Sequence, residues 1–215
     1  MNDADKNKPV VLIGGGGHAS VVCDILKHQR REICAIVSVD DVSSRSIFKG
    51  LDVLRTDDEI LKFDPHKVSL INCIGSLPGT SLKKKVNEKY LAKGYFFETL
   101  VSDYAYVSPF ATLHSGVQVF TGAIVQSGAC IGNHTVINSG AIIEHDTLVG
   151  DYSFIAPGAV ICGQCKIENN VFIGANATII QSIHIQSGTI ITAGALVTKD
   201  TLQGQKVSAQ RSVIK

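Results

Sequence analysis

Residues 131–161 read IGNHTV INSGAI IEHDTL VGDYSF IAPGAV I, and an aliphatic residue opens every group of six. The same spacing continues in both directions without a slip, so that sixteen consecutive positions obey it. They are Val107, Leu113, Val119, Val125, Ile131, Ile137, Ile143, Val149, Ile155, Ile161, Ile167, Ile173, Ile179, Ile185, Ile191 and Val197. Self-similarity at a fixed short period indicates a repeat architecture.

Each group of six has the composition of one short strand and one turn. The aliphatic residue is expected to point inward, and the small residue that usually follows four positions later, as at Ala123 and Ala141, relieves crowding near the corner. Glycine and asparagine fill the positions between, where tight corners need a positive φ. One unit cannot bury its apolar face alone, so stacked units must form a continuous core.

The first part of the chain alternates apolar strands with helices, which predicts a small parallel α/β domain. Thr56 and Glu59 have the spacing of a capping box at a helix start, and the run Lys83-Lys84-Lys85 is expected on a solvated helix face. The expected strands cover residues 10–13, 33–37, 68–74 and 95–98, with helices after the first strand and over 81–93.

Charge density changes abruptly along the chain. Only seven Asp, Glu, Lys or Arg residues lie between positions 107 and 201, whereas the first 106 residues carry most of the charges. We therefore place the boundary between two domains there, giving domains of residues 1–106 and 107–215.

The overall composition excludes several classes of partner. With 20 Lys+Arg and 19 Asp+Glu the net charge is +1, so no nucleic acid or anionic membrane surface is expected as a partner. No apolar run approaches a membrane span, and the polar N-terminus predicts no signal peptide. Six cysteines without a framework spacing indicate reduced thiols, and together these features predict a cytoplasmic protein.

A glycine run, Gly14-Gly15-Gly16-Gly17, connects the first expected strand to the first helix and is followed by His18. Such glycines let backbone amides approach a phosphate at a helix N-terminus. Asp40 or Asp41, past the second strand, is placed to accept a hydrogen bond from a ribose or base. About a hundred residues cannot supply the two halves of an NAD site, so another nucleotide is expected.

His145 lies between Glu144 and Asp146 in a region that is otherwise nearly free of charge. A neighbouring carboxylate favours the protonated form of imidazole and brings its pKa toward neutrality, which suits a general base. The pattern therefore predicts proton-transfer chemistry at this corner; the alternative is a surface histidine in a solvated acidic patch.

Both halves together resemble the sugar O-/N-acyltransferases of the PglD, NeuD and perosamine N-acetyltransferase type. The resemblance is carried by Gly14–His18, Asp40-Asp41, the segments CIGS at 73–76 and INSGAIIEHD at 137–146, and AGALVTKD at 193–200. It implies a Rossmann-like nucleotide-sugar-binding domain followed by a left-handed parallel β-helix in which three groups of six make one coil. It also implies a homotrimer that binds acetyl-CoA between subunits.

The resemblance assigns roles to individual residues. His145 falls on the catalytic base, Asp146 on its acidic partner, Asn138 on an acceptor-side residue, and Gly163 on the amide that contacts the thioester carbonyl. Acetyl-CoA contacts are further implied for Ala175, Ala193, Lys199 and Arg211. Contacts with the nucleotide-activated amino sugar are implied for Gly14, Gly16, Gly17, His18, Asp40, Asp41, Gly75 and Ser76. With eighteen residues per coil, Gly163 should lie one coil from His145, about 5 Å away.

The chain departs from this family at two places. Many relatives have a second histidine where Phe154 stands, and in the C-terminal segment only Arg211 keeps a positive charge. A zinc hydratase that uses the same fold would need three histidines converging at one site. His114, His134 and His184 share no eighteen-residue register with His145, so no metal is expected.

The leading hypothesis is an acetyl-CoA-dependent N-acetyltransferase acting on the 4-amino group of a nucleotide-linked 4-amino-4,6-dideoxy sugar. UDP is the favoured nucleotide, with dTDP and GDP left open. One alternative is O-acetylation of a sialic acid or related sugar. Another, of a different class, is a non-catalytic β-helix that senses nucleotide sugars or acts as a scaffold.

Overall fold

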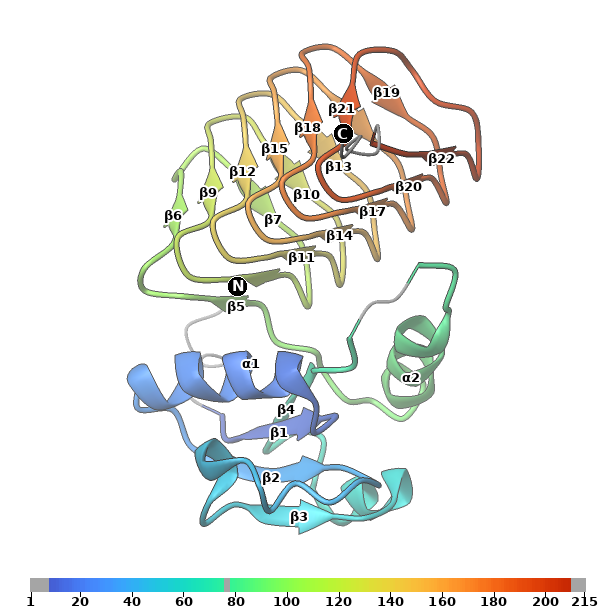
Figure 1. Cartoon of the computed structure of the whole chain (residues 1–215). Helices are drawn as coiled ribbons and strands as arrows, with labels where there is room; N and C mark the ends of the chain where they lie inside the picture. The colour runs from blue at the N-terminus through green and yellow to red at the C-terminus, as the bar shows by residue number, and fades with distance from the viewer. Residues whose placement is uncertain (1–7, 76–77, 210–215) are drawn as a thin grey trace, which may run out of the picture. The chain divides into compact units, whose positions relative to one another are not determined.

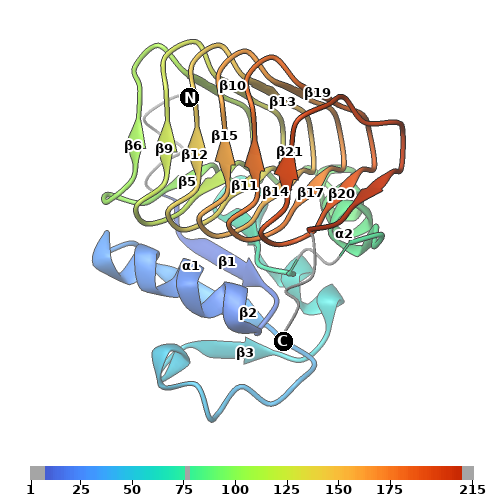
Figure 2. The ribbon, with the colours of Figure 1, turned by 45° about the horizontal axis from the view of Figure 1, so that its top comes forward.

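Short parallel strands, all but the last pair eighteen residues apart, pair with one another in the second part of the computed structural model, which describes residues 8–75 and 78–209. Val136 pairs with Phe154, for example, and Ile142 with Val160. Three strands therefore complete one coil, and the coils stack in a row (Figures 1 and 2). This unit is the left-handed parallel β-helix that was predicted.

The β-helix has three faces, which we name by their number of strands. The seven-strand face holds β5 (Leu100–Val101), β8 (Gln118–Val119), β11 (Val136–Ile137), β14 (Phe154–Ile155), β17 (Phe172–Ile173), β20 (Ile190–Ile191) and β22 (Lys206–Val207). The six-strand face holds β6 (Tyr106–Val107), β9 (Ile124–Val125), β12 (Ile142–Ile143), β15 (Val160–Ile161), β18 (Thr178–Ile179) and β21 (Leu196–Val197). The five-strand face holds β7 (Thr112–Leu113), β10 (Cys130–Ile131), β13 (Leu148–Val149), β16 (Lys166–Ile167) and β19 (His184–Ile185).

The second residue of nearly every strand points into the β-helix and is buried, as the six-residue pattern predicts. Ala141, Ala159 and Ala177 are also fully buried and fill the corners, and Cys165 takes the same kind of position as a core thiol. Corners repeatedly adopt a positive φ, both at glycines such as Gly140 (66°) and at Asp146 (58°). The corner geometry therefore fixes the backbone beside His145.

The first unit is a four-stranded parallel sheet in the order β3-β2-β1-β4. Its strands are β1 (Val10–Ile13), β2 (Ile33–Val37), β3 (Asp52–Leu54) and β4 (Ser69–Asn72). Its helices are α1 (Gly17–His28), α2 (Leu82–Leu91) and two short 3₁₀ segments, η2 (Ser46–Phe48) and η3 (Asp57–Lys62). The capping box predicted at Thr56 and Glu59 is present at the start of η3. Because β1 lies between β2 and β4, a crevice opens at the carboxyl end of β1, where open α/β sheets bind ligands.

Two expectations for this unit were wrong, and one strand was missed. The strand expected at residues 95–98 is reduced to a single bridge between Leu70 and Phe97, and β3 was not anticipated. Lys83 does not lie on a solvated helix face: it is on the buried side of α2, and only 8% of its surface is exposed.

The chain divides into two compact units, residues 1–98 and 99–215. The composition change at residue 106 lies inside the first coil, because the chain enters the β-helix at β5. Among the described residues, no helix has the length and apolar character that a membrane span requires.

Candidate active site

The glycine run forms a turn in which each glycine has a different reason to be there. Gly14 has a φ of 111°, and its N–H donates to the carbonyl of Val37 at 2.8 Å. A Cβ on Gly15 would come within 2.5 Å of Ser38 Oγ, whereas a Cβ on Gly16 or Gly17 would meet nothing within 4 Å. The first two glycines are therefore required by packing, and the last two leave open space at the start of α1.

A cavity of about 420 Å³ occupies this space and collects most of the residues predicted to bind a nucleotide sugar. Its lining includes Gly14, Gly16, Gly17, His18, Asp40 and Gly75. The first N–H groups of a helix have no partner within the helix, so this cavity offers donors to an anion. Ser76 lies outside the described residues.

Asp40 and Asp41, which the sequence could not distinguish as ligand-binding residues, have different surroundings in the structure. Asp41 accepts hydrogen bonds from the Ser43 N–H at 2.9 Å and from Ser43 Oγ at 2.8 Å, and these bonds lower the pKa of its carboxyl group. It lines a neighbouring cavity instead. Asp40 lines the cavity at the glycine turn, so Asp40 is the carboxylate placed to contact a ligand there.

In the β-helix, His145 lies at the corner between the six-strand and five-strand faces, which we name the His corner. Its Nδ1 is 2.9 Å from Asp146 Oδ2, as expected for an orienting carboxylate. A Cβ on Gly163, one coil further, would lie 2.6 Å from His145 Nε2. The imidazole therefore covers the backbone of Gly163, and only glycine leaves room for it.

Free hydrogen-bonding groups meet at this corner. Within the described residues, neither the N–H of Gly163 nor Nε2 of His145 has a hydrogen-bond partner, although the Gly163 carbonyl accepts from Ser182 at 3.0 Å. With Nδ1–H donating to Asp146, Nε2 carries the basic lone pair. The corner thus places a base beside a hydrogen-bond donor, which is the pairing that acyl transfer requires.

Asn138 does not join His145 within one protomer. It lies at the opposite end of β12, at the corner between the seven-strand and six-strand faces, which we name the Asn corner. Its Oδ1 accepts from the Ser139 N–H at 2.8 Å. Among the residues predicted to contact acetyl-CoA, Ala175 and Ala193 lie on the Asn corner, whereas Gly163 and Lys199 lie on the His corner. Arg211 lies outside the described residues.

The remaining histidines have separate surroundings. His114 Nε2 is 3.5 Å from Cys130 Sγ, and the ring of His134 stacks on Tyr152. His184 lies on β19. Across residues 8–75 and 78–209 no group of three His, Cys, Asp or Glu side chains could hold a metal ion. Phe154, at the position of the family's second histidine, stacks on Phe172 with a ring separation of 5.5 Å.

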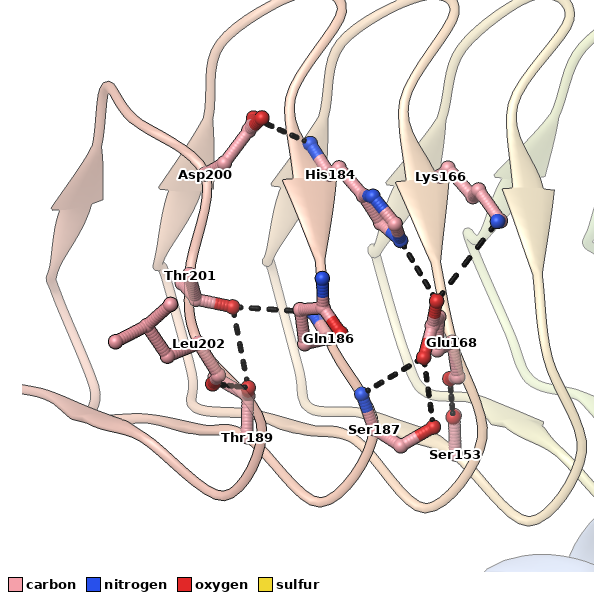
Figure 3. A network of polar contacts seen from close by, with 10 residues as sticks. All are labelled: Ser153, Lys166, Glu168, His184, Gln186, Ser187, Thr189, Asp200, Thr201 and Leu202. Carbon is pink, nitrogen blue, oxygen red and sulfur yellow. Dashed lines mark hydrogen bonds and ion pairs between the residues drawn. The ribbon is translucent and has the colours of Figure 1, made fainter.

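The sequence did not reveal a polar network that joins the last coils (Figure 3). Glu168 accepts from His184 Nε2 at 2.8 Å, from Ser187 Oγ at 2.9 Å and from the Ser187 N–H at 3.1 Å. These hydrogen bonds lower the pKa of Glu168. Because its oxygens bind groups of the following coil, Glu168 holds the two coils together. The Ser187 hydroxyl donates to this carboxylate and not to the imidazole of His184.

Comparisons with known proteins agree with this division into two units. Residues 9–89 match the model of the PglD N-terminal domain, and residues 131–163 and 164–199 match that of the bacterial transferase hexapeptide (six repeats). A search of curated protein sequences returned no significant match.

Solved structures are similar over nearly the whole chain. A variant of perosamine N-acetyltransferase from Caulobacter crescentus, in complex with CoA and GDP-perosamine, is 28% identical with a TM-score of 0.84, covering 94% of this chain and 93% of that one. The acetyltransferase domain of PglB from Neisseria gonorrhoeae, in complex with acetyl coenzyme A, is 27% identical with a TM-score of 0.83, covering 94% and 97%.

An α/β unit with a glycine turn, followed by a hexapeptide-repeat β-helix with a histidine–carboxylate corner, defines a hexapeptide acyltransferase. Within that class, the chain combines a PglD N-terminal domain with hexapeptide repeats, and this combination matches the PglD/NeuD-type sugar acyltransferases.

Proposed function

We propose that this protein is an N-acetyltransferase that moves the acetyl group of acetyl-CoA to the 4-amino group of a nucleotide-linked 4-amino-4,6-dideoxy sugar. The observation that carries the proposal is the His145–Asp146 pair directly over the backbone of Gly163. The two similar acetyltransferases with CoA or acetyl-CoA bound, and GDP-perosamine in one of them, support both substrate classes.

In the proposed reaction His145 Nε2 takes a proton from the amine as it attacks the thioester carbonyl. Asp146 fixes the ring through Nδ1 and stabilises the imidazolium that forms. The N–H of Gly163 donates to the carbonyl oxygen as negative charge develops on it. His145 can then return the proton to the departing thiolate, so the chain supplies no covalent nucleophile.

The residues at the His corner fit a thioester. Within the described residues the Gly163 N–H has no acceptor and lies beside the His145 ring, and Lys199 lies on the same corner two coils beyond Gly163. The N–H can donate to a thioester carbonyl next to the base, and a lysine further along the corner can pair with a phosphate of the same molecule.

A second copy of the chain is needed to complete this site. Asn138 and His145 lie at opposite ends of the six-strand face, so they can meet only across an interface between protomers. That face carries an outward row of mostly apolar side chains: Tyr106, Ile124, Ile142, Val160, Thr178 and Leu196, with 55% of Tyr106 and 63% of Leu196 exposed. Three six-strand faces around a three-fold axis would cover this row and bring the His corner of one copy to the Asn corner of the next.

The nucleotide of the sugar substrate is proposed to bind in the cavity at the glycine turn. The start of α1 offers N–H donors to the diphosphate, and Asp40 offers a carboxylate to the ribose or base. We take UDP as the first nucleotide to test, by analogy with bacillosamine-type relatives, and GDP as the second, since the C. crescentus enzyme holds GDP-perosamine.

Release of the CoA thiol, measured with UDP-, dTDP- and GDP-linked 4-amino sugars and with a sialic acid, tests this function. The proposal expects rapid thiol release with one of the amino sugars and little with the sialic acid. Preferred turnover of the sialic acid would favour the O-acetyltransferase, and no turnover with any sugar would favour the non-catalytic alternative.

A further inference from the structure

A groove lies on the five-strand face, away from the His corner. It has a volume of about 410 Å³, within the range of small-molecule pockets. Its floor is formed by Gly132 and Gly150, which lie in one eighteen-residue row with His114 at one end and Glu168 at the other. Because two glycines occupy the middle of this row, the groove is open between the two end residues.

Coil stacking imposes these two glycines. A Cβ on Gly132 would lie 2.6 Å from the carbonyl carbon of Gly150, and a Cβ on Gly150 would lie 2.7 Å from that of Glu168. Both contacts are with backbone atoms, which cannot move aside cheaply. The glycine floor of the groove is therefore a fixed part of the β-helix backbone, and side chains such as Leu148 and Lys166 complete its lining.

A thiol and an imidazole meet at one end of this groove. Cys130 is the outward residue of β10, so its side chain lies on the surface while that of Ile131 is buried. Its Sγ is 3.5 Å from Nε2 of His114, which follows the adjacent strand β7. Both residues line the groove.

The other five cysteines lack this arrangement. Cys23, Cys73 and Cys165 are buried, which protects them from reagents in solution. Cys34 and Cys162 are partly accessible, but neither has an imidazole at hydrogen-bond distance in the described part of the chain. In Cys34, burial raises the pKa of the thiol further. A thiolate is the reactive form of cysteine, and an adjacent imidazole can take the thiol proton.

The five-strand face is suited to remain open to solvent. Its outward row is Thr112, Cys130, Leu148, Lys166 and His184, which is more polar than the row on the six-strand face. Lys166, with 58% of its side chain exposed, also lines the groove, and Leu148 lies between it and Cys130. Its Nζ lies 3.7 Å from Glu168 Oε1, and because such an exposed ion pair is weak, the lysine can exchange this partner for a carboxylate of a bound molecule.

From this geometry we infer that Cys130 and His114 form a reactive thiol site for low-molecular-weight disulfides such as oxidised glutathione. His114 Nε2 takes the proton of the Cys130 thiol, and the thiolate attacks one sulfur of the disulfide. The bond between the two reagent sulfurs breaks, and the second sulfur leaves with the electron pair and takes the proton from His114. The products are a mixed disulfide on Cys130 and one free thiol.

The test treats the purified full-length protein with oxidised glutathione at pH 7 and follows each cysteine by peptide mass spectrometry. Cys130 is expected to react about tenfold faster than Cys34 or Cys162, since thiolate character controls the rate. His114→Asn should slow Cys130 by about tenfold and leave Cys34 unchanged. His66→Asn, at an exposed position of the first unit, is the matched control and should change neither rate.

Thermal unfolding of each variant shows that it is folded before its rates are compared. Reaction of Cys130 no faster than that of Cys34 and Cys162 would overturn the inference. So would an unchanged Cys130 rate in a folded His114→Asn protein. Because the groove shares no residue with the His corner, loss of acetyltransferase activity in another test leaves this result unaffected.

Discussion

The imidazole of His145 covers the backbone of Gly163, such that a Cβ at position 163 would lie 2.6 Å from Nε2 and from Cε1. The two residues are eighteen apart and belong to successive coils, and the N–H of Gln164 donates to the His145 carbonyl at 2.9 Å. The stacking of coils thus builds the base and the hydrogen-bond donor into one rigid frame.

Gly163→Ala should impair catalysis more than folding. The new methyl group would displace the His145 ring, which can move because 58% of its side chain is exposed. We expect kcat to fall by about 10²-fold, the order of magnitude that misplacing a reacting group costs, with little change in Tm. Gly150→Ala is the contrasting variant: its Cβ would lie 2.7 Å from the carbonyl carbon of Glu168, which cannot move aside, so Tm should fall. A Gly163→Ala enzyme with wild-type kcat would contradict the placement of His145.

Gly16→Val should raise KM for the nucleotide sugar and leave KM for acetyl-CoA nearly unchanged. A side chain at position 16 meets nothing within 4 Å, so the fold tolerates it while it enters the cavity. Steady-state kinetics with each substrate varied in turn measures the two constants. An equal rise in both KM values would mean that the two binding sites are misassigned.

Ile142→Glu should dissociate the proposed trimer, because Ile142 is the outward residue of β12 on the apolar six-strand face. Leu148→Glu introduces the same charge six residues later on the five-strand face, where 49% of Leu148 is exposed, and should leave the trimer intact. Light scattering measures both masses. An active wild-type monomer would remove the basis for a site shared between copies.

Lys83→Met should stabilise the protein at pH 7. Lys83 Nζ is buried without a hydrogen-bond partner, and burial lowers the pKa of its amine from 10.5 to about 8. Below pH 8 both the folded and the unfolded state carry the charge, so the folded state bears the full cost of burying it. The gain at pH 7 is expected on the order of 1–3 kcal/mol.

The stability gained by Lys83→Met should become smaller as the pH rises from 8 to 10.5. In this range the folded state loses the proton of Lys83 while the unfolded state still binds it, so wild-type stability rises with pH relative to the variant. Denaturant unfolding at several pH values checks this, and Lys85→Met, on the exposed side of α2, serves as control. A variant that is less stable than the wild type at pH 7 would refute the prediction.

The sequence predicted the parts of this molecule that follow from periodicity. A six-residue period with buried aliphatic residues predicts stacked units with a continuous core. The coil of eighteen residues, which places Gly163 beside His145, came from the family resemblance. The glycine turn was predicted from the run of glycines between a strand and a helix, and the helix start at Thr56 from its capping box; the structure contains both. These signals are local, so a single sequence contains them.

Features that depend on side-chain direction could not be predicted in the same way. Asp40 and Asp41 are adjacent and chemically identical, and only the turn made by Ser43 decides which of them faces the cavity. Lys83 has the same local sequence as Lys84 and Lys85, yet the packing of α2 buries Lys83 alone of the three. Cys130 and His114 are sixteen residues apart in sequence and meet because β7 and β10 are neighbouring strands.

The most direct test of the account is the kcat of His145→Ala at pH 7 and the pH dependence of its residual activity. If His145 is the general base, kcat should fall by about 10²–10⁴-fold, and the acidic limb of the pH–rate profile should disappear. Asp146→Asn should lower kcat by less than His145→Ala does, because Asp146 orients the ring and does not receive the substrate proton. A folded His145→Ala enzyme with near-wild-type kcat and an unchanged acidic limb would contradict the account. Glu144, His145 and Asp146 would then be a solvated surface patch without a catalytic role.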